Sequence, residues 1–303
     1  MRRYDPHSTL RQRLAYLLKE FAPENSIDSQ NDIPKKWERF DDVGIIPQGS
    51  FGDSAWSAIP ERRLWEVVAD SLGVSRLYMK GEVRGGKRRP EIECLFGAEK
   101  GSWVVRKENG IYFGYDIEES MWSAGNVNER KRMGDIVSTG EVVLDLFAGI
   151  GYYTIPILKS DSSIKVISCE WNIPSVEALE WNLKRNKCQS RCSILIGNCL
   201  ETVPKMDLLV DRVVMGLLPD STFAIQVATN ALSDKGGFIH MHGLSPSKGY
   251  SNQCQEWLEI MSDTTNDLKV REASITRVKS YAPNWDHVVL NVELTPNFDI
   301  IRE

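Results

Sequence analysis

An acidic residue and two glycines follow directly on an apolar run, and together they could hold a nucleoside. Residues 142–146 form an apolar stretch typical of a buried strand, with Asp145 near its end. Gly149 and Gly151 then allow a sharp turn and a close backbone approach to a ligand. The dinucleotide fingerprint requires a third glycine at position 154, where this chain has a threonine. The turn therefore does not predict a pyrophosphate site.

Further strand ends carry groups that suit a nucleoside cofactor. Residues 164–170 form an apolar strand whose last residue, Glu170, is spaced to grip a ribose diol. The next strand is followed by Asn198, which can read an adenine edge, and a fourth ends in residues 216–219. Because ligands of open α/β sheets bind outside the carboxyl ends of the strands, this pattern predicts a doubly wound sheet that holds S-adenosylmethionine. A Rossmann-like fold without a cofactor is the alternative, since each polar residue alone is more often a helix cap or turn residue.

Length, charge and cysteine content define a broad class. The chain has 303 residues, which at about 100 to 200 residues per domain predicts two domains. It has neither an apolar run long enough to cross a bilayer nor a secretory signal, so we expect a cytoplasmic protein with no membrane partner. Its six scattered cysteines favour reduced thiols, and the sequence contains no recognisable metal-binding or Ser-His-Asp pattern. The net charge of −5 does not by itself indicate a nucleic-acid partner.

Two short runs nevertheless concentrate positive charge. One surrounds a Gly-Gly turn and contains Lys87, Arg88 and Arg89, and the other contains Lys131 and Arg132. We expect these side chains to contact RNA phosphates, because lysine and arginine supply the salt-dependent part of nucleic-acid affinity. A solvated hairpin tip and an exposed helix explain the same charges equally well.

The pattern of apolar and polar residues along the chain changes near residues 33 and 115. We expect an N-terminal helix and linker over residues 1–33 and a small α+β domain that binds RNA or substrate over residues 34–115. We expect a Rossmann-like catalytic domain of the class I methyltransferase type over residues 116–303. The fold class is therefore α/β with a smaller N-terminal α+β domain.

Periodicity predicts the main elements within these domains. The small domain should contain a helix at 61–72 and strands near 76–79, 91–96 and 101–107. In the catalytic domain, Pro174 opens a helix that should pack on a parallel sheet. A terminal strand and a hairpin should close that sheet, at 238–241, 276–281 and 287–294.

Four stretches resemble the tRNA wybutosine-synthesising aminocarboxypropyltransferases, which are relatives of the tRNA guanine N1-methyltransferases. These stretches are residues 121–130 (MWSAGNVNER), 145–151 (DLFAGIG), 211–219 (DRVVMGLLP) and 278–283 (VKSYAP). The similarity extends from about residue 42 to residue 294. It implies transfer of the 3-amino-3-carboxypropyl group of S-adenosylmethionine to a carbon of a tricyclic guanine derivative beside the anticodon of phenylalanine tRNA, with release of methylthioadenosine.

The resemblance also implies a set of cofactor residues. The positions that match the family are Ser123, Arg130, Glu170, Asn198 and Cys199. The strand-end loops add Asp145, Phe147, Gly149, Gly151 and Trp171 to the residues expected to bind the cofactor. Relatives usually carry aspartate where Asn198 stands. An amide oxygen can still accept a hydrogen bond, so we expect the same cofactor to bind, with an affinity that this difference puts in question.

The residues at the end of the fourth strand distinguish aminocarboxypropyl transfer from methylation. Methyltransferases of base nitrogens often carry Asn/Asp-Pro-Pro there, whereas Gly216, Leu217 and Pro219 offer no polar side chain to a substrate base. A carbon nucleophile loses its proton after the new bond forms, so it needs less help from a base and positioning should carry most of the rate. We expect Arg130 to steer the arm by gripping its carboxylate, and Glu129 either to hold the arm's amino group or to pair with a neighbouring cation.

Aromatic residues beside the expected loops could stack on adenine or on an RNA base, although each also suits ordinary core packing. They are Trp122, Tyr152, Tyr153, Trp171 and Trp285. Two other functions stay open: a tRNA guanine N1-methyltransferase with the same fold, and a non-catalytic RNA-binding adaptor. We expect the protein to act as a monomer without a metal ion.

Overall fold

The computed structural model describes residues 5–25, 32–84, 89–265 and 268–297, and for residues 82–84 and 89–91 the backbone alone. Residue contacts divide the chain into two compact units. The first unit comprises Met1–Arg106 and Gly114–Met121, and the second comprises Lys107–Phe113 and Trp122–Glu303. Each unit is described by itself.

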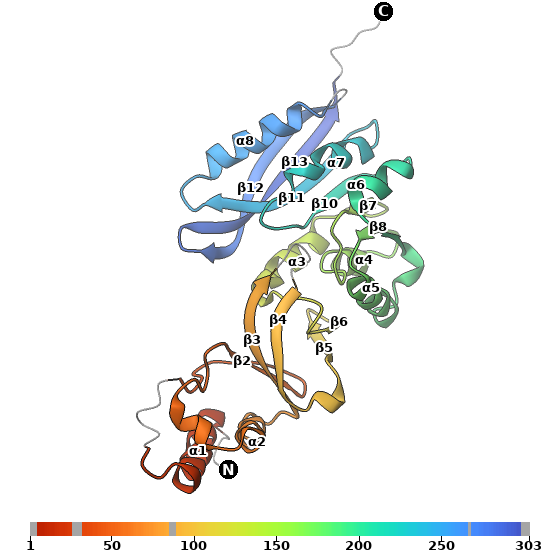
Figure 1. The fold of residues 1–303 in the computed structure, drawn as a ribbon. Coiled ribbons are helices and arrows are strands. Elements are labelled where there is room, and N and C mark those ends of the chain that lie inside the picture. Colours follow the sequence, from red (N-terminus) through yellow and green to blue (C-terminus); the bar gives the residue numbers. More distant parts are fainter. Residues whose placement is uncertain (1–4, 26–31, 85–88, 266–267, 298–303) are drawn as a thin grey trace, which may run out of the picture. The chain divides into compact units, whose positions relative to one another are not determined.

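The first unit combines two helices with a four-stranded sheet (Figure 1). Its helices are α1 (Pro6–Phe21) and α2 (Glu61–Leu72), and its strands, in sheet order, are β1 (Glu38–Phe40), β2 (Val43–Pro47), β3 (Arg76–Arg84) and β4 (Arg89–Phe96). Strands β2 and β3 are parallel, and the other neighbours are antiparallel. The helix predicted at residues 61–72 is confirmed, whereas β1 and β2 were not predicted.

One hydrophobic core joins both helices of this unit. Leu10 and Leu14 of α1 pack in the same cluster as Leu64 and Val68 of α2. All four side chains are almost completely buried. The expected boundary near residue 33 therefore does not separate two cores, because the apolar face of α1 needs α2 to cover it.

The chain passes between the two units within a hairpin of β5 (Trp103–Glu108) and β6 (Ile111–Asp116). Its turn holds Asn109 at φ +49° and Gly110 at φ +81°. Two residues of positive φ are what a tight two-residue hairpin requires, and Asn-Gly is the usual sequence for it. The first strand was predicted at residues 101–107, and the second was missed.

The second unit is built around a seven-stranded sheet (Figure 1). In sheet order its strands are β12 (Leu268–Ala282), β13 (Trp285–Pro296), β11 (Gly237–Pro246), β10 (Arg212–Met215), β7 (Val142–Asp145), β8 (Lys165–Glu170) and β9 (Cys192–Ile196). Its helices are α3 (Val127–Asp135), α4 (Thr154–Ser160), α5 (Ile173–Arg185), α6 (Cys199–Thr202), α7 (Ile225–Ala231) and α8 (Tyr250–Ser262).

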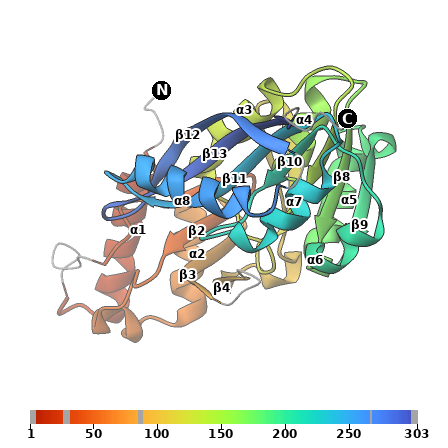
Figure 2. The same ribbon diagram turned by 90° about the horizontal axis from the view of Figure 1, so that it is seen from above.

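Strands β9, β8, β7, β10 and β11 are parallel to one another, and β13 is antiparallel to both of its neighbours. Helices α7 and α8 lie on one face of the sheet, and α3 and α4 lie on the other (Figure 2). A parallel sheet covered on both faces is a doubly wound sheet, and the terminal strand and hairpin close it as predicted.

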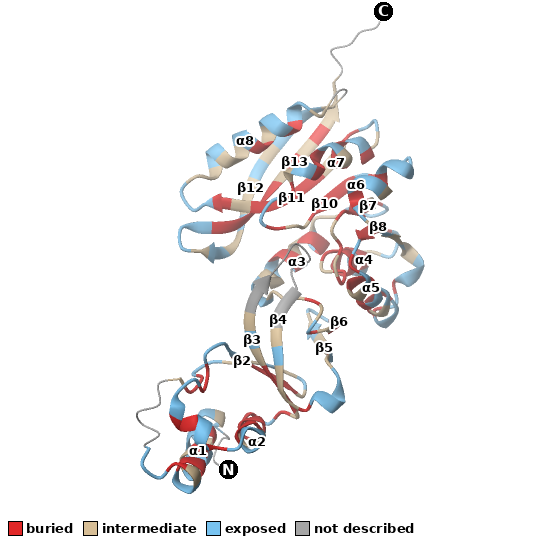
Figure 3. Ribbon diagram, viewed as in Figure 1, coloured by how far each residue is buried: buried red, intermediate tan, exposed pale blue. Residues whose placement is uncertain are grey.

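The central strands are the most buried part of the second unit (Figure 3). Leu144 of β7, Val213 of β10 and Ile239 of β11 have essentially no exposed surface. Edge strand β9 is only partly covered. Central burial explains the continuous apolar runs in the sequence, because strands with helices on both faces have no polar side.

Strand β12 is much longer than the predicted segment at residues 276–281, and it contains three irregularities in its pairing with β13. No helix among the described residues is long and apolar enough to span a membrane. All six cysteines are free thiols.

Candidate functional site

The candidate site lies at one edge of the large sheet. Since β7, β8, β9, β10 and β11 are parallel, their carboxyl ends meet at this edge. Strand β12 runs in the same direction as β11, because each is antiparallel to β13. The last residues of β12 therefore reach the same edge as the loops that the sequence assigned to a cofactor.

Glycines shape the loop after β7. Gly149 and Gly151 have φ values of +56° and +94°. A Cβ on Gly149 would lie 2.8 Å from the ring of Tyr152, and one on Gly151 would lie 2.8 Å from Leu179. Both positions require glycine, which gives the loop the tight turn that the sequence predicted.

Glu170, at the end of β8, is fixed by three backbone amides. Its Oε2 accepts a hydrogen bond from the amide of Gly149 at 2.7 Å, and its Oε1 accepts from Trp171 at 2.9 Å and Asn172 at 2.8 Å. Burial raises its pKa, and these hydrogen bonds oppose that rise. A carboxylate offers about four acceptor positions, so one position on Oε2 is left for a ribose hydroxyl.

Asp145, at the end of β7, is buried beneath the loop that follows this strand. Its side chain has no exposed surface and accepts hydrogen bonds from the Thr154 hydroxyl at 2.8 Å and the Phe147 amide at 3.4 Å. Burial raises the pKa of Asp145 to about 6. Asp145 thus ties the end of β7 to α4, and it acts on the shape of the loop.

The remaining loop residues differ in accessibility. Asn198 is exposed, and its side-chain oxygen accepts from the Leu200 amide at 3.1 Å, which caps α6. Trp171 is 53% exposed, so its ring is available to a ligand, whereas Cys199 is buried. Phe147 is half-buried, with its ring edge-on to Phe223 at 5.9 Å.

Arg130 is buried in an ion pair that the sequence did not predict. Its Nε and Nη2 donate to the two carboxylate oxygens of Glu108, each at 2.6 Å, and its Nη1 donates to the backbone carbonyl of Ser123 at 3.0 Å. The guanidinium also lies 4.3 Å from the ring centroid of Trp122. The fork expected to grip the arm's carboxylate is therefore occupied by Glu108 in this structure.

The basic run in α3 is not a uniform cationic surface. Glu129 is buried and accepts two hydrogen bonds from Arg132, at 2.7 and 2.8 Å. Of the two roles expected for Glu129, the structure thus shows the pairing with a neighbouring cation. Lys131 is exposed and pairs with Asp135 at 2.5 Å. In the second basic run, Lys87 and Arg88 lie outside the described residues, and Arg89 is described by its backbone alone.

The fourth strand end packs against an aromatic ring. A Cβ on Gly216 would lie 2.7 Å from the ring of Tyr153, so this position also requires glycine. Beyond it is an apolar hollow with two partly exposed aromatic rings at its rim. Its lining residues are Pro219, Leu244, Tyr281, Ala282 and Trp285. Leu217 is half-buried.

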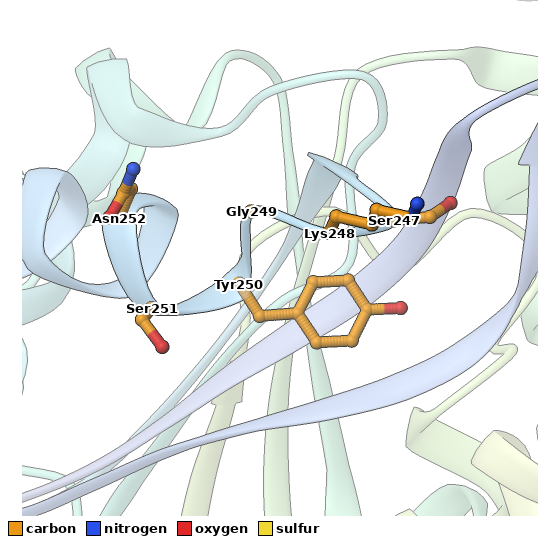
Figure 4. A pocket seen from close by; sticks show the side chains of 6 residues that line it. All are labelled: Ser247, Lys248, Gly249, Tyr250, Ser251 and Asn252. Carbon is orange, nitrogen blue, oxygen red and sulfur yellow. The ribbon is translucent and has the colours of Figure 1, made fainter.

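Behind this strand end, the ring of Tyr153 contacts that of buried His242, whose Nδ1 lies 2.9 Å from Nε2 of His287. His287 is buried as well. A second hollow lies between β11 and α8, where Figure 4 shows six consecutive residues, 247–252. None of the residues expected at the site lines it, and among the described residues no cluster suits a metal ion.

Two residues at the site were missed by sequence reasoning. Lys279 donates a hydrogen bond to the hydroxyl of Ser123 at 2.5 Å, and Glu108 neutralises Arg130. Lys279 stands within the stretch 278–283 that carries the family resemblance, so that stretch was the available signal. Nothing in the local sequence marks Glu108 as a partner of α3.

The residues present fit an adenosyl nucleoside: a fixed carboxylate for the ribose, loop glycines with no room for a side chain, and an exposed tryptophan and amide beside them. The sheet order, terminal hairpin and strand-end loops define a Rossmann-like fold of the class I methyltransferase type. Residues 104–271 match the TRM5/TYW2 methyltransferase domain, and residues 14–101 match the TYW2 N-terminal domain. The chain belongs to the TRM5/TYW2 family.

Similar proteins agree with this membership. The chain is 37% identical over 297 residues to tRNA wybutosine-synthesizing protein 2/3/4 of Arabidopsis thaliana, which covers 95% of this chain and 29% of that protein. It is 32% identical over 327 residues to the tRNA wybutosine-synthesizing protein 2 homolog of Macaca fascicularis, covering 89% of this chain and 72% of that protein. The crystal structure of P. horikoshii TYW2 in complex with MeSAdo superposes with a TM-score of 0.75 at 28% identity, covering 95% of this chain and all of that one.

Proposed function

We propose that this chain transfers the 3-amino-3-carboxypropyl group of S-adenosylmethionine to a tricyclic guanosine derivative in tRNA, and that methylthioadenosine leaves. The observation that carries the proposal is the combination of a nucleoside-binding edge around Glu170 with a fourth strand end that has no polar side chain from Gly216 to Pro219. The names of the wybutosine-synthesizing relatives and the MeSAdo complex of the P. horikoshii protein support it.

The loops at the sheet edge bind the cofactor in this proposal. Glu170 accepts a ribose hydroxyl, Trp171 covers a face of the nucleoside, and Asn198 contacts the adenine edge. Main-chain atoms of Gly149 and Gly151 approach closely because no Cβ stands in the way. Asp145 and Cys199 support these loops from within, since both are buried.

When bound, S-adenosylmethionine would supply a sulfonium-activated carbon to the ring carbon of the base. The electrons of the broken C–S bond would stay on sulfur in methylthioadenosine, and the ring carbon would release its proton after the new bond forms. The protein's own task is positioning, since a carbon nucleophile needs no strong base before it attacks. Arg130 contributes by holding the Ser123 carbonyl and the Trp122 ring in place. In this role Arg130 is a positioning residue for the arm.

The substrate side is formed by the loop from Gly216 to Pro219 and the apolar hollow beside it. The partly exposed rings of Tyr281 and Trp285 at this hollow suit stacking on an RNA base, which is sequence-tolerant because every base has a flat face. The substrate we propose is the anticodon loop of phenylalanine tRNA, bound with help from the basic turn around residues 87–89. We propose that the protein acts as a monomer and in the cytoplasm.

Incubation with hypomodified phenylalanine tRNA and cofactor labelled in the aminocarboxypropyl carbons tests this function. We expect label in the nucleoside and release of methylthioadenosine, both measured by mass spectrometry. Transfer of the methyl group with release of S-adenosylhomocysteine would instead establish a guanine N1-methyltransferase. Tight RNA binding without cofactor uptake in calorimetry would establish an adaptor.

A further inference from the structure

Helix α5 forms side-chain hydrogen bonds both to the loop after β7 and to the hairpin of β5 and β6. We infer that two asparagines of this region, Asn182 and Asn186, are positioning residues for S-adenosylmethionine. They hold the cofactor loop, residues 148–153, in the shape that binds the ligand, and they fix this shape to the hairpin. The inference rests on the proposed function, because it needs the cofactor bound against this loop.

Asn182 fixes the cofactor loop between its two glycines. Its side chain is fully buried, and its Nδ2 donates a hydrogen bond to the backbone carbonyl of Ile150 at 2.8 Å. Ile150 stands between Gly149 and Gly151, which both have positive φ. Because glycine adopts many backbone conformations at little cost, a bond to the peptide between two glycines selects one of them. Leu179 of the same helix packs directly on Gly151.

Asn186, which follows the last residue of α5, ties the helix to the hairpin. Its Oδ1 accepts from the amide of Tyr112 at 2.9 Å, and its Nδ2 donates to the carbonyl of Tyr112 at 2.7 Å. An antiparallel partner strand would make the same exchange of two hydrogen bonds. The Nδ2 of Asn186 also donates to the backbone carbonyl of Asn182 at 2.8 Å. The guanidinium of Arg185 lies 4.4 Å from the centroid of the Tyr112 ring, which it holds from the side.

A second set of contacts joins the same hairpin to the cofactor loop. The tip of the hairpin, Lys107–Phe113, belongs to the second unit. The ring of Phe113 lies 5.1 Å from that of Trp122, and the Trp122 ring lies 6.0 Å from that of Tyr152. Tyr152 is part of the cofactor loop. The hairpin tip therefore reaches this loop twice, through the two asparagines and through aromatic rings.

A loop held in one shape binds its ligand more tightly than a loop that samples several, because only the competent fraction binds. The amide of Gly149 donates to Oε2 of Glu170, so a displaced loop would also release the carboxylate proposed to hold the ribose. S-adenosylmethionine and methylthioadenosine share the adenosyl group. Both ligands should therefore depend on Asn182 and Asn186.

The test measures ligand binding to the full chain with the asparagines replaced one at a time and together. Calorimetry gives the affinities of S-adenosylmethionine and methylthioadenosine for Asn182→Ala, Asn186→Ala and the double variant. Hydrogen exchange of peptides that cover residues 148–153 reports the opening of the loop. Asn291→Ala is the matched control, because Asn291 of β13 also bonds through its side chain, to His240 at 2.8 Å and to Thr276 at 3.1 Å.

We expect Asn182→Ala to weaken both ligands about 5- to 100-fold, the range for a buried carbonyl left unsatisfied, and to speed exchange in the loop. Asn186→Ala should weaken both about 2- to 10-fold, the range for a single neutral hydrogen bond, and it tests the inference even where Asn182→Ala folds poorly. The double variant should bind within about twofold of Asn182→Ala, because Asn186 acts through Asn182. In the transfer assay, KM for S-adenosylmethionine should rise while kcat changes less than about twofold.

A merely structural role would lower the free energy of unfolding and leave the affinities of the folded chain unchanged, as we expect for Asn291→Ala. Unchanged affinities in the single variants, additive losses in the double variant, or equal weakening by Asn291→Ala would overturn the inference. Product identity tests the proposed function separately, because a methylated nucleoside would refute that function whatever the affinities are.

Discussion

Arg130 and Glu108 form a bidentate ion pair in which both nitrogen–oxygen distances are 2.6 Å. The two residues are 22 positions apart, and only 2% of the arginine side chain and 16% of the glutamate side chain are exposed. The same guanidinium holds the carbonyl of Ser123. The pair therefore anchors the segment before α3 to the β5–β6 hairpin, beside the proposed site for the cofactor arm.

Removing one member of this pair should destabilise the protein. Arg130→Ala leaves Glu108 as a largely buried, uncompensated charge, so we expect the free energy of unfolding to fall by about 3 to 5 kcal/mol. Urea denaturation measures the loss. The control is Lys131→Ala on the same helix, whose pair with Asp135 is exposed and should contribute less than about 1 kcal/mol. Similar losses for the two variants would contradict the assigned difference in burial.

Glu170 should be required by every ligand that carries the adenosyl group. Glu170→Gln replaces one carboxylate oxygen by an NH₂ donor that faces backbone amides, so both S-adenosylmethionine and methylthioadenosine should bind about 10- to 100-fold more weakly. Calorimetry with both ligands measures the change. Glu201→Gln, an exposed acidic residue just beyond the same sheet edge, should bind both normally. Weaker binding of only one of the two ligands would show that Glu170 does not hold the ribose that they share.

Asp145 should make folding depend on pH. Burial raises its pKa to about 6, against about 3.9 in an unfolded chain, so between these values the folded chain keeps a proton that the unfolded chain has released. The free energy of unfolding should therefore fall by about 2 kcal/mol from this group as the pH rises from 4 to 7. Asp145→Asn cannot titrate. The difference in unfolding free energy between wild type and this variant should shrink by that amount, and a pH-independent difference would refute the assignment.

The apolar hollow should bind RNA through its aromatic rim. Trp285 is 44% exposed there, and Trp285→Ala should weaken tRNA binding about 5- to 100-fold, the range expected when one base no longer stacks on an aromatic ring. Trp285→Phe retains a flat face and should bind close to wild type. Fluorescence anisotropy with labelled tRNA measures both affinities. Equal weakening by the two substitutions would place the RNA base elsewhere.

The basic turn predicted from the sequence should contribute to RNA affinity through charge alone. Replacing Lys87, Arg88 and Arg89 by glutamine should lower tRNA affinity and make the dependence of log K on log salt shallower, by roughly 0.7 to 0.9 for each RNA phosphate that is no longer neutralised. Titrations at several salt concentrations measure this slope. An unchanged slope would remove the turn from the RNA-binding surface.

Local signals were sufficient where an element is specified by its own residues. Helix α2 begins and ends as predicted, because Pro60 precedes it and Gly73 adopts the left-handed conformation that ends it. The central strands were recognised because burial on both faces makes them continuously apolar. The short strand β1, with three partly or fully exposed residues, has no such pattern and was missed.

The sequence by itself determined the strands of the large sheet, the glycine turns at its edge and the carboxylate that ends β8, because these depend on sterics and hydrophobic periodicity within a few residues. Only the tertiary structure decided which charged groups face a ligand. Asp145 is fully buried, and Arg130 is paired with Glu108, 22 positions away. Lys279 donates a hydrogen bond to the hydroxyl of Ser123, 156 positions away. Charge pairing depends on distance in space and on burial, and neither can be read from positions far apart in the chain.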